Sequence, residues 1–145
     1  MTSRRIILLA AVTAVALAPF CRAESDHQVE ARKVALDLAG AFANDGFKVR
    51  DGHWTGTVKK GDRAVVAVNL YAGNEYWFSV AGVEKGPKFS LGLYDEHGKP
   101  VQTEEFAEDE KAAAGFSPTI SGQYFVSIAA NEGDTGTLCL VYSYK

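Results

Sequence analysis

The chain has very little cysteine. It contains two, Cys21 and Cys139, and the first lies in a segment that we expect to be removed from the protein. The single cysteine that remains cannot form a disulfide within the chain. Cys139 stands between Leu138 and Leu140 in a strand-like pattern, which predicts a buried apolar residue and not a nucleophile. A hydrophobic core must therefore hold the fold together, and a chain of about 120 residues is long enough to build one.

Basic residues are also scarce, and they are scattered along the chain. The sequence has 15 lysines and arginines against 18 acidic residues, which gives a formal net charge of −3. Loss of residues 1–23 would remove three arginines and leave a charge of −6. No cluster of lysine and arginine is present that could neutralise a row of phosphates, so we expect no nucleic-acid binding. An acidic chain is instead suited to a basic partner.

Motifs for catalysis and metal binding are missing as well. The sequence has no G-x-S-x-G motif, which would expose a nucleophilic serine on a strand-to-helix turn. The three histidines, His27, His53 and His97, lie in separate segments, and none has a second ligand at the spacing of a zinc site. The acidic run at 104–110 lacks the regular carboxylate spacing and the glycine of a calcium-binding loop. We therefore expect no catalytic residues, no metal site and no cofactor.

A hydrophobic run long enough to span a membrane is absent too. The apolar segment 6–20 is shorter than the roughly 18 to 20 residues that a spanning helix needs, and it contains Pro19. Two arginines precede it, and Cys21 and Ala23 supply the small residues that a signal peptidase reads. The bulky residue before Cys21 argues against lipid attachment there. We interpret residues 1–23 as a signal peptide and expect a periplasmic or secreted protein that starts at Glu24, with no stable membrane insertion after cleavage.

The residues that follow the signal, 24–46, predict one amphipathic helix. Ser25 and Gln28 have the spacing of a capping box, and residues 28–44 are rich in good helix formers. The apolar positions recur at three- and four-residue spacing and comprise Ala31, Val34, Ala35, Leu38, Ala41 and Phe42. We expect this stripe to dock on the domain's own sheet, with a partner protein's helix as the alternative.

Residues 47–145 predict a single antiparallel β-domain. Alternating apolar residues indicate strands near 53–58, 63–70, 75–82, 88–94, 112–117, 123–130 and 136–144. Clusters of Gly, Asn and Asp at 60–62, 73–74, 96–98 and 133–134 mark tight turns, which would make successive strands antiparallel neighbours. The acidic segment 103–111 breaks the alternation and is interpreted as a solvated loop or one helical turn. No internal repeat of useful length is present, which disfavours solenoids and propellers.

Three segments resemble bacterial pre-peptidase C-terminal domains. They are 69–78 (NLYAGNEYWF), 91–98 (LGLYDEHG) and 121–126 (SGQYFV), and the resemblance covers roughly residues 47–145. It implies an antiparallel jelly-roll β-sandwich, here preceded by the N-terminal helix, that serves as an accessory module of an exported protein. Some members of that family bind matrix polymers and others bind calcium through carboxylates clustered near the start of the domain. This chain has only Asp45 and Asp51 there, so no calcium ligands are carried over.

Segment 121–124 is also similar to periplasmic inhibitors of lysozyme, whose protruding loops enter the cleft of the enzyme. Under that resemblance, the loop around Ser121 and Tyr124 would be the inhibitory element. An acidic inhibitor would suit a basic lysozyme.

Aromatic side chains are the other candidates for a binding site. Adjacent residues of a strand point to opposite faces, so Trp77 faces away from the core if Tyr76 and Phe78 face inward. Trp77 then lies beneath the helix or offers an exposed stacking platform. We expect a non-catalytic binding module of the cell envelope, with Trp54, Tyr71 and Trp77 as ligand-binding residues and an envelope protein or polysaccharide as partner. A periplasmic inhibitor of a lysozyme-type enzyme is the alternative.

Overall fold

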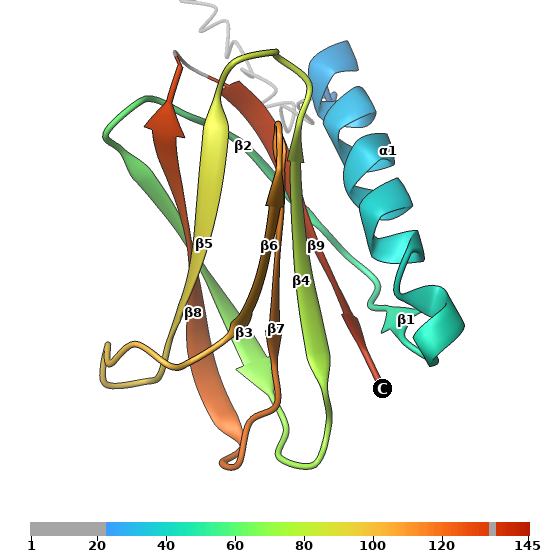
Figure 1. Cartoon of the computed structure of the whole chain (residues 1–145), viewed down its shortest axis with the longest axis vertical. Helices are drawn as coiled ribbons and strands as arrows, with labels where there is room; N and C mark the ends of the chain where they lie inside the picture. Colours follow the sequence, from blue (N-terminus) through green and yellow to red (C-terminus); the bar gives the residue numbers. More distant parts are fainter. Residues whose placement is uncertain (1–22, 134–135) are drawn as a thin grey trace, which may run out of the picture.

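The computed structural model describes residues 23–133 and 136–145. The predicted signal peptide, apart from Ala23, and the turn residue Asp134 lie outside the described residues. The described chain forms two antiparallel sheets and one α-helix, which lies on the outside of the larger sheet (Figure 1). The prediction of a mainly β protein with one N-terminal helix is confirmed.

The larger sheet, sheet A, contains strands from both ends of the described chain. Its order is β1-β9-β4-β7-β6, and β2 also pairs with β9. The bounds are β1 Lys48–Val49, β2 Trp54–Val58, β4 Tyr76–Gly82, β6 Glu104–Glu108, β7 Lys111–Phe116 and β9 Gly136–Tyr144. The smaller sheet, sheet B, has the order β3-β8-β5, with β3 Arg63–Leu70, β5 Lys88–Tyr94 and β8 Gly122–Glu132. All of the pairings are antiparallel.

The hydrophobic core fills the space between the two sheets. Alternate residues of the strands that line it face inward, as the two-residue period of a strand requires. Phe78 and Val80 of β4 and Ile128 of β8 are fully buried in this cluster, together with Leu138 of β9. Tyr76 belongs to the same cluster, so β4 has the orientation expected from the sequence.

The predicted tight turns do not join neighbouring strands, and this part of the prediction is wrong. β2 and β3, β3 and β4, and β8 and β9 each lie in different sheets. Among the described residues, β6 and β7 are the consecutive strands that pair directly. Facing sheets are about 10 Å apart, and about three residues of extended chain span that distance, so a short connection fits either arrangement. Turn 96–98 closes a local loop in which Tyr94 pairs with Pro100.

The acidic segment 103–111 is neither a loop nor a helical turn. Most of it is β6, which pairs with β7 at the edge of sheet A and is exposed along its whole length. Phe106 lies opposite Ala113 in this ladder. A strand that is exposed on both faces needs no alternation of apolar and polar residues, so the sequence pattern did not reveal β6. Its carboxylates suit an edge, because charge there discourages pairing with another chain.

The helix α1, Asp26–Gly40, begins with the predicted capping box. The Ser25 hydroxyl accepts a hydrogen bond from the Gln28 backbone N–H, and the Gln28 side chain accepts one from the Ser25 N–H. The α-helix ends at Gly40, four residues earlier than predicted, and the chain tightens into a 3-10 turn, η1 (Ala43–Asp45). Gly46 ends that turn at φ 88°, a left-handed backbone conformation that glycine adopts without strain.

The helix docks on the outer face of sheet A through small side chains. Ala31, Ala35 and Ala39 are buried against Cys139 and Val141 of β9, with Ala81 of β4 in the same cluster. Docking on the domain's own sheet is thus confirmed, as is the burial of Cys139.

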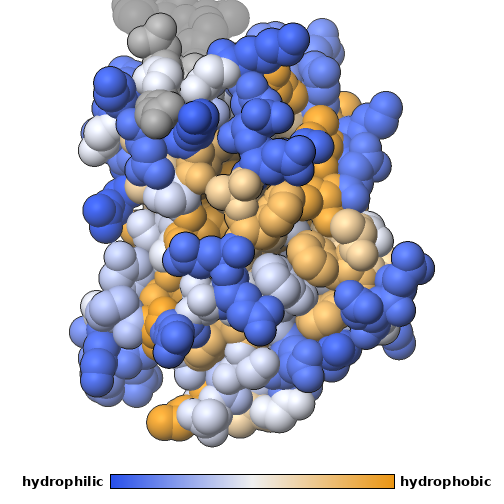
Figure 2. All heavy atoms as spheres, in the orientation of Figure 1, coloured by the Kyte–Doolittle hydropathy of each residue, from blue (hydrophilic) through white to orange (hydrophobic). Residues whose placement is uncertain are grey.

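The hydrophobic surface on the face shown in Figure 2 gathers near its centre and is bordered by hydrophilic residues.

Candidate functional site

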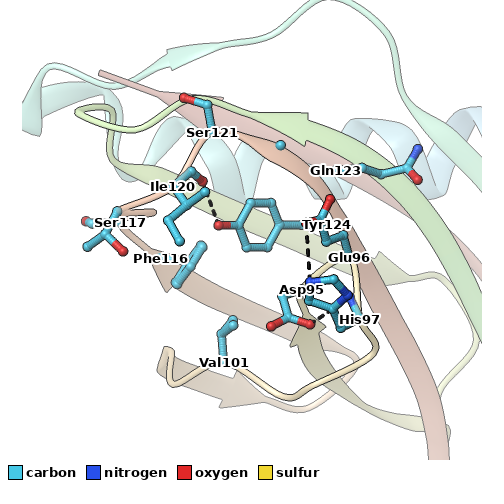
Figure 3. Close-up of a pocket in the computed structure, with 12 residues that line it drawn as sticks. Asp95, Glu96, His97, Val101, Phe116, Ser117, Ile120, Ser121, Gln123 and Tyr124 are labelled. Atoms are coloured by element: carbon cyan, nitrogen blue, oxygen red, sulfur yellow. Dashed lines mark hydrogen bonds and ion pairs between the residues drawn. The ribbon is translucent and has the colours of Figure 1, made fainter.

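A cavity of about 330 Å³ opens between two segments that follow different strands. One wall comes from residues 95–101, which leave β5, and the other from residues 116–124, which connect β7 to β8 (Figure 3). We call this cavity the end pocket. Its volume is at the lower end of the range in which proteins bind small molecules or single side chains, about 300 to 1,000 Å³.

Apolar side chains form the inner surface of the end pocket. The Phe116 and Tyr124 rings lie with their centroids 5.4 Å apart. Val101 stands opposite them and packs against the core cluster, as Phe116 does. The Val101 N–H donates a hydrogen bond of 2.9 Å to the Leu93 carbonyl, which fixes this segment to the end of β5. The apolar surface is therefore continuous with the core and rigidly held.

The Tyr124 hydroxyl fastens the loop that precedes β8. It donates a hydrogen bond of 2.7 Å to the Ile120 carbonyl, four residues upstream. β-Sandwiches use a tyrosine in the same way at a corner between strands. Burial raises the pKa of Tyr124, and the negative charges of Asp95 and Glu96 raise it further. The two carboxylates therefore influence the interior of the pocket.

The acidic side of the pocket is built on a tight turn. Oδ1 of Asp95 accepts hydrogen bonds from the backbone N–H groups of His97 and Lys99, both at 2.9 Å. Gly98 completes the turn at φ 75°. Oε1 of Glu96 lies 3.4 Å from Nε2 of His97, and both of these side chains are largely exposed. The turn thus holds Asp95 firmly, while Glu96 and His97 sit at the rim.

The opposite rim carries Ser121 and Ile120. Oγ of Ser121 accepts a hydrogen bond of 2.8 Å from the backbone N–H of Ala72, which ties the loop to the connection between β3 and β4. Ile120 is 72% exposed, the highest value among the exposed large hydrophobic residues of the described chain. An apolar side chain therefore projects into solvent directly beside the pocket.

Of the residues expected to form a site, Ser121 and Tyr124 both line the end pocket. Val101, Phe116 and Ile120 were not foreseen. Glu96 and His97 belong to the predicted turn 96–98 and Asp95 precedes it, and the sequence gives none of the three a role in a site. The sequence marks a turn at 96–98 but gives no signal that residues 95–101 and 116–124 meet, because the 14 residues 102–115, which include β6 and most of β7, separate them.

The three aromatic candidates do not come together. Trp54 pairs with Leu140 and faces inward, whereas Trp77 pairs with Ser143 and Gly115 and faces the helix side of sheet A. Trp54 lines a separate cavity of about 200 Å³ at the open edge between β2 and β3. Tyr71 is 55% exposed in the connection between β3 and β4.

Trp77 does not offer a free stacking surface. The Phe42 ring is stacked on it at a centroid distance of 4.4 Å and an interplanar angle of 9°. On β7, a side-chain carbon at Gly115 would come within 2.9 Å of the indole, so the ring lies across that glycine. The segment that follows α1 thus covers one face of the indole and β7 lies close against it, which makes Trp77 part of the packing between helix and sheet.

The end pocket combines several kinds of polar group with apolar side chains. Its polar groups are carboxylates, hydroxyls, an amide and an imidazole, and they surround an apolar floor. Among the described residues, no group of three or more His, Cys, Asp or Glu side chains is arranged to hold a metal ion. The Ser121 hydroxyl accepts its hydrogen bond from a backbone N–H and has no histidine partner. The pocket therefore provides groups for non-covalent recognition of a ligand.

No protein-family model matches the chain, and no curated protein matches it either.

None of the helices in the described part of the chain is both long and apolar enough to cross a membrane.

Proposed function

We propose that this protein is an exported, non-catalytic binding module of the cell envelope and that the end pocket is its ligand site. The observation that carries the proposal is the composition of the pocket. Two anchored segments bring a rigid apolar floor and a fixed carboxylate to one cavity, where Ser121 and Tyr124 also lie. Ligand sites commonly combine a mainly apolar surface with a few fixed polar groups in this way.

The strand order supports the relationship to pre-peptidase C-terminal domains. Successive strands alternate between the sheets from β2 to β5, and β9 returns to pair with β2. That path is expected of a jelly roll with two four-stranded sheets. β6 departs from it, since it extends sheet A beside β7 and leaves sheet B with three strands. A jelly-roll accessory module is therefore the interpretation that we propose.

A pocket-blocking variant tests the ligand site. Gly122 lines the end pocket, and a side-chain carbon added there meets no heavy atom within 4 Å. Gly122→Tyr should therefore fill the cavity without disturbing β8. Gly40→Tyr at the end of α1 is the matched control, because a side-chain carbon there is equally unobstructed.

Each variant is immobilised and exposed to envelope extract, and the retained material is identified by mass spectrometry and sugar analysis. We expect wild type and Gly40→Tyr to retain the same partner and Gly122→Tyr to lose it. Equal retention by all three proteins would place the ligand site elsewhere.

Inhibition of a lysozyme-type enzyme is the second candidate function, and the exposure of Ile120 favours it. This side chain projects beside the pocket from a loop that is fastened at Ser121 and Tyr124. If the loop enters an enzyme cleft, Ile120→Asp should abolish inhibition of purified lysozymes. Val65→Asp, at an exposed position on β3, should not. Because the inhibitor is acidic and the enzyme basic, the inhibition should also weaken with added salt.

A further inference from the structure

The end pocket has a fixed negative charge that no cation of the described residues neutralises. Asp95 forms no ion pair with a lysine, arginine or histidine in the described parts of the chain. Oδ1 is occupied by the two backbone N–H groups of the turn, which leaves Oδ2 available. Glu96 adds a second carboxylate at the rim, and its partner is the exposed imidazole of His97.

The apolar floor lies directly beside these charges. Tyr124 is 7% exposed, so nearly all of its ring is already covered by the protein. The direction of its pKa shift shows that the charges of Asp95 and Glu96 extend to its hydroxyl. A ligand group that fills the pocket must therefore match an apolar wall along its length and a negative potential at one end.

A long basic side chain has this combination of properties. The methylene groups of lysine and arginine pack on apolar surfaces while their charged ends reach polar surroundings. On the basis of the proposed function, we infer that the end pocket binds a lysine or arginine side chain of a partner protein. Its stem lies along the half-buried side chains of Phe116 and Val101, and its charged end lies at Asp95 and Glu96.

Two further observations favour a protein as the source of the cation. Ile120 stands 72% exposed beside the pocket, where it would contact the partner's surface around the inserted side chain. The chain also carries a net negative charge of −3, which complements a basic protein. A metal ion is a poorer occupant, because the described carboxylates do not form a group able to hold one.

The inference is tested with short capped peptides as probes and the ¹⁵N-labelled protein. The peptides are Gly-Gly-X-Gly-Gly, in which X is lysine, arginine, norleucine or glutamate. Norleucine keeps the apolar stem of lysine and lacks its charge. We expect the lysine or arginine peptide to shift amide resonances of residues 95–101 and 116–124. The norleucine peptide should bind about tenfold more weakly or worse, since a charge-assisted hydrogen bond contributes about 1.5 to 3 kcal/mol.

A charge-removing variant provides the second arm. Asp95→Asn keeps the side-chain oxygen that accepts from His97 and Lys99, so the turn should remain folded while the charge is lost. We expect this variant to bind the basic peptides about tenfold more weakly. Asp62→Asn, the same change in the connection between β2 and β3, should bind as wild type does.

The outcomes separate this inference from the proposed function. Equal binding of the lysine and norleucine peptides, or unchanged binding by Asp95→Asn, would overturn the role of charge while the pocket remains a ligand site. Absence of peptide binding, together with loss of the envelope partner in Gly122→Tyr, would also overturn the inference alone. A chitosan oligomer that shifts the same amides when the basic peptides do not would assign the cation to a polysaccharide and overturn the protein partner.

Discussion

Cys139 lies in the packed layer between α1 and sheet A. It is 0% exposed beneath α1, and burial raises the pKa of its thiol from 9.0 to about 11. The Arg32 charge lowers this pKa and the Glu24 charge raises it, but both effects are smaller than that of burial. The neutral thiol is therefore the form that the folded protein favours.

This shift predicts a loss of stability in alkali. Because the pKa is higher in the folded state, the contribution of the thiol to stability is complete below pH 9 and is lost as pH rises towards 11. Between pH 8 and pH 10.5 wild type should lose about 2 kcal/mol more free energy of unfolding than Cys139→Ala. Urea unfolding of both proteins at both pH values measures the difference. Equal losses would mean that the thiol ionises as freely in the folded protein as in the unfolded chain.

Two serines near the same face of sheet A should be replaceable by alanine without a loss of stability. Ser79 and Ser143 are buried, and their hydroxyl oxygens have no hydrogen-bond partner among the described residues. A buried hydroxyl without a partner costs about 1 to 3 kcal/mol. We therefore expect Ser79→Ala and Ser143→Ala to leave the free energy of unfolding unchanged or to raise it by up to about 1 kcal/mol.

Ser121→Ala is the control for these substitutions, because the Ser121 hydroxyl accepts a hydrogen bond from Ala72. It should lower the free energy of unfolding by about 0.5 to 1.5 kcal/mol. All three variants are compared by urea denaturation. A loss of more than about 1 kcal/mol in Ser79→Ala or Ser143→Ala would show that these hydroxyls are satisfied in solution.

Among the elements, α1 can dock closely on sheet A because the residues that contact the sheet are small. Ala35 is fully buried against the sheet, whereas the next residue, Leu36, is exposed. Ala35→Leu should push the helix away from the sheet and lower the free energy of unfolding by about 1 to 3 kcal/mol. Leu36→Ala should change it by less than about 0.5 kcal/mol. If Ala35→Leu proved harmless in the same urea experiment, the close approach of helix and sheet would not be a constraint.

The elements differ in how well their sequences predict them. The strands β2 to β5 and β7 to β9 have at least one buried face, and the sequence marks each of them to within two residues. α1 was foreseen from its capping box and apolar spacing, although its buried stripe runs through Ala39 and not Ala41. β6 was missed because neither of its faces is buried. The spacing of apolar residues therefore reveals a strand or helix that has a buried face, and it does not reveal one that has none.

At the scale of the whole molecule, the arrangement of strands could not be predicted from local signals. Short turns such as 60–62 were expected to form hairpins, yet they carry the chain between sheets. The end pocket follows from this long-range arrangement, since it forms where residues 95–101 meet residues 116–124. Ser121 and Tyr124 were found through a family resemblance, and Asp95 only through the structure. The sequence thus predicted most of the strands and the helix, but it did not predict the order of the strands in the two sheets.

The position of β9 has a consequence for the order of events during folding. This strand follows all of the other described strands in sequence, yet it lies inside sheet A, where it pairs with β1, β2 and β4 and supports α1. Until residues 136–144 have left the ribosome, β2 lacks its strand partner and the helix has only part of its docking face. Proteins dominated by such distant pairings fold slowly, over roughly milliseconds to seconds. Sheet A therefore cannot close before residues 136–144 have been made, and until then the strands already synthesised form only an incomplete sheet.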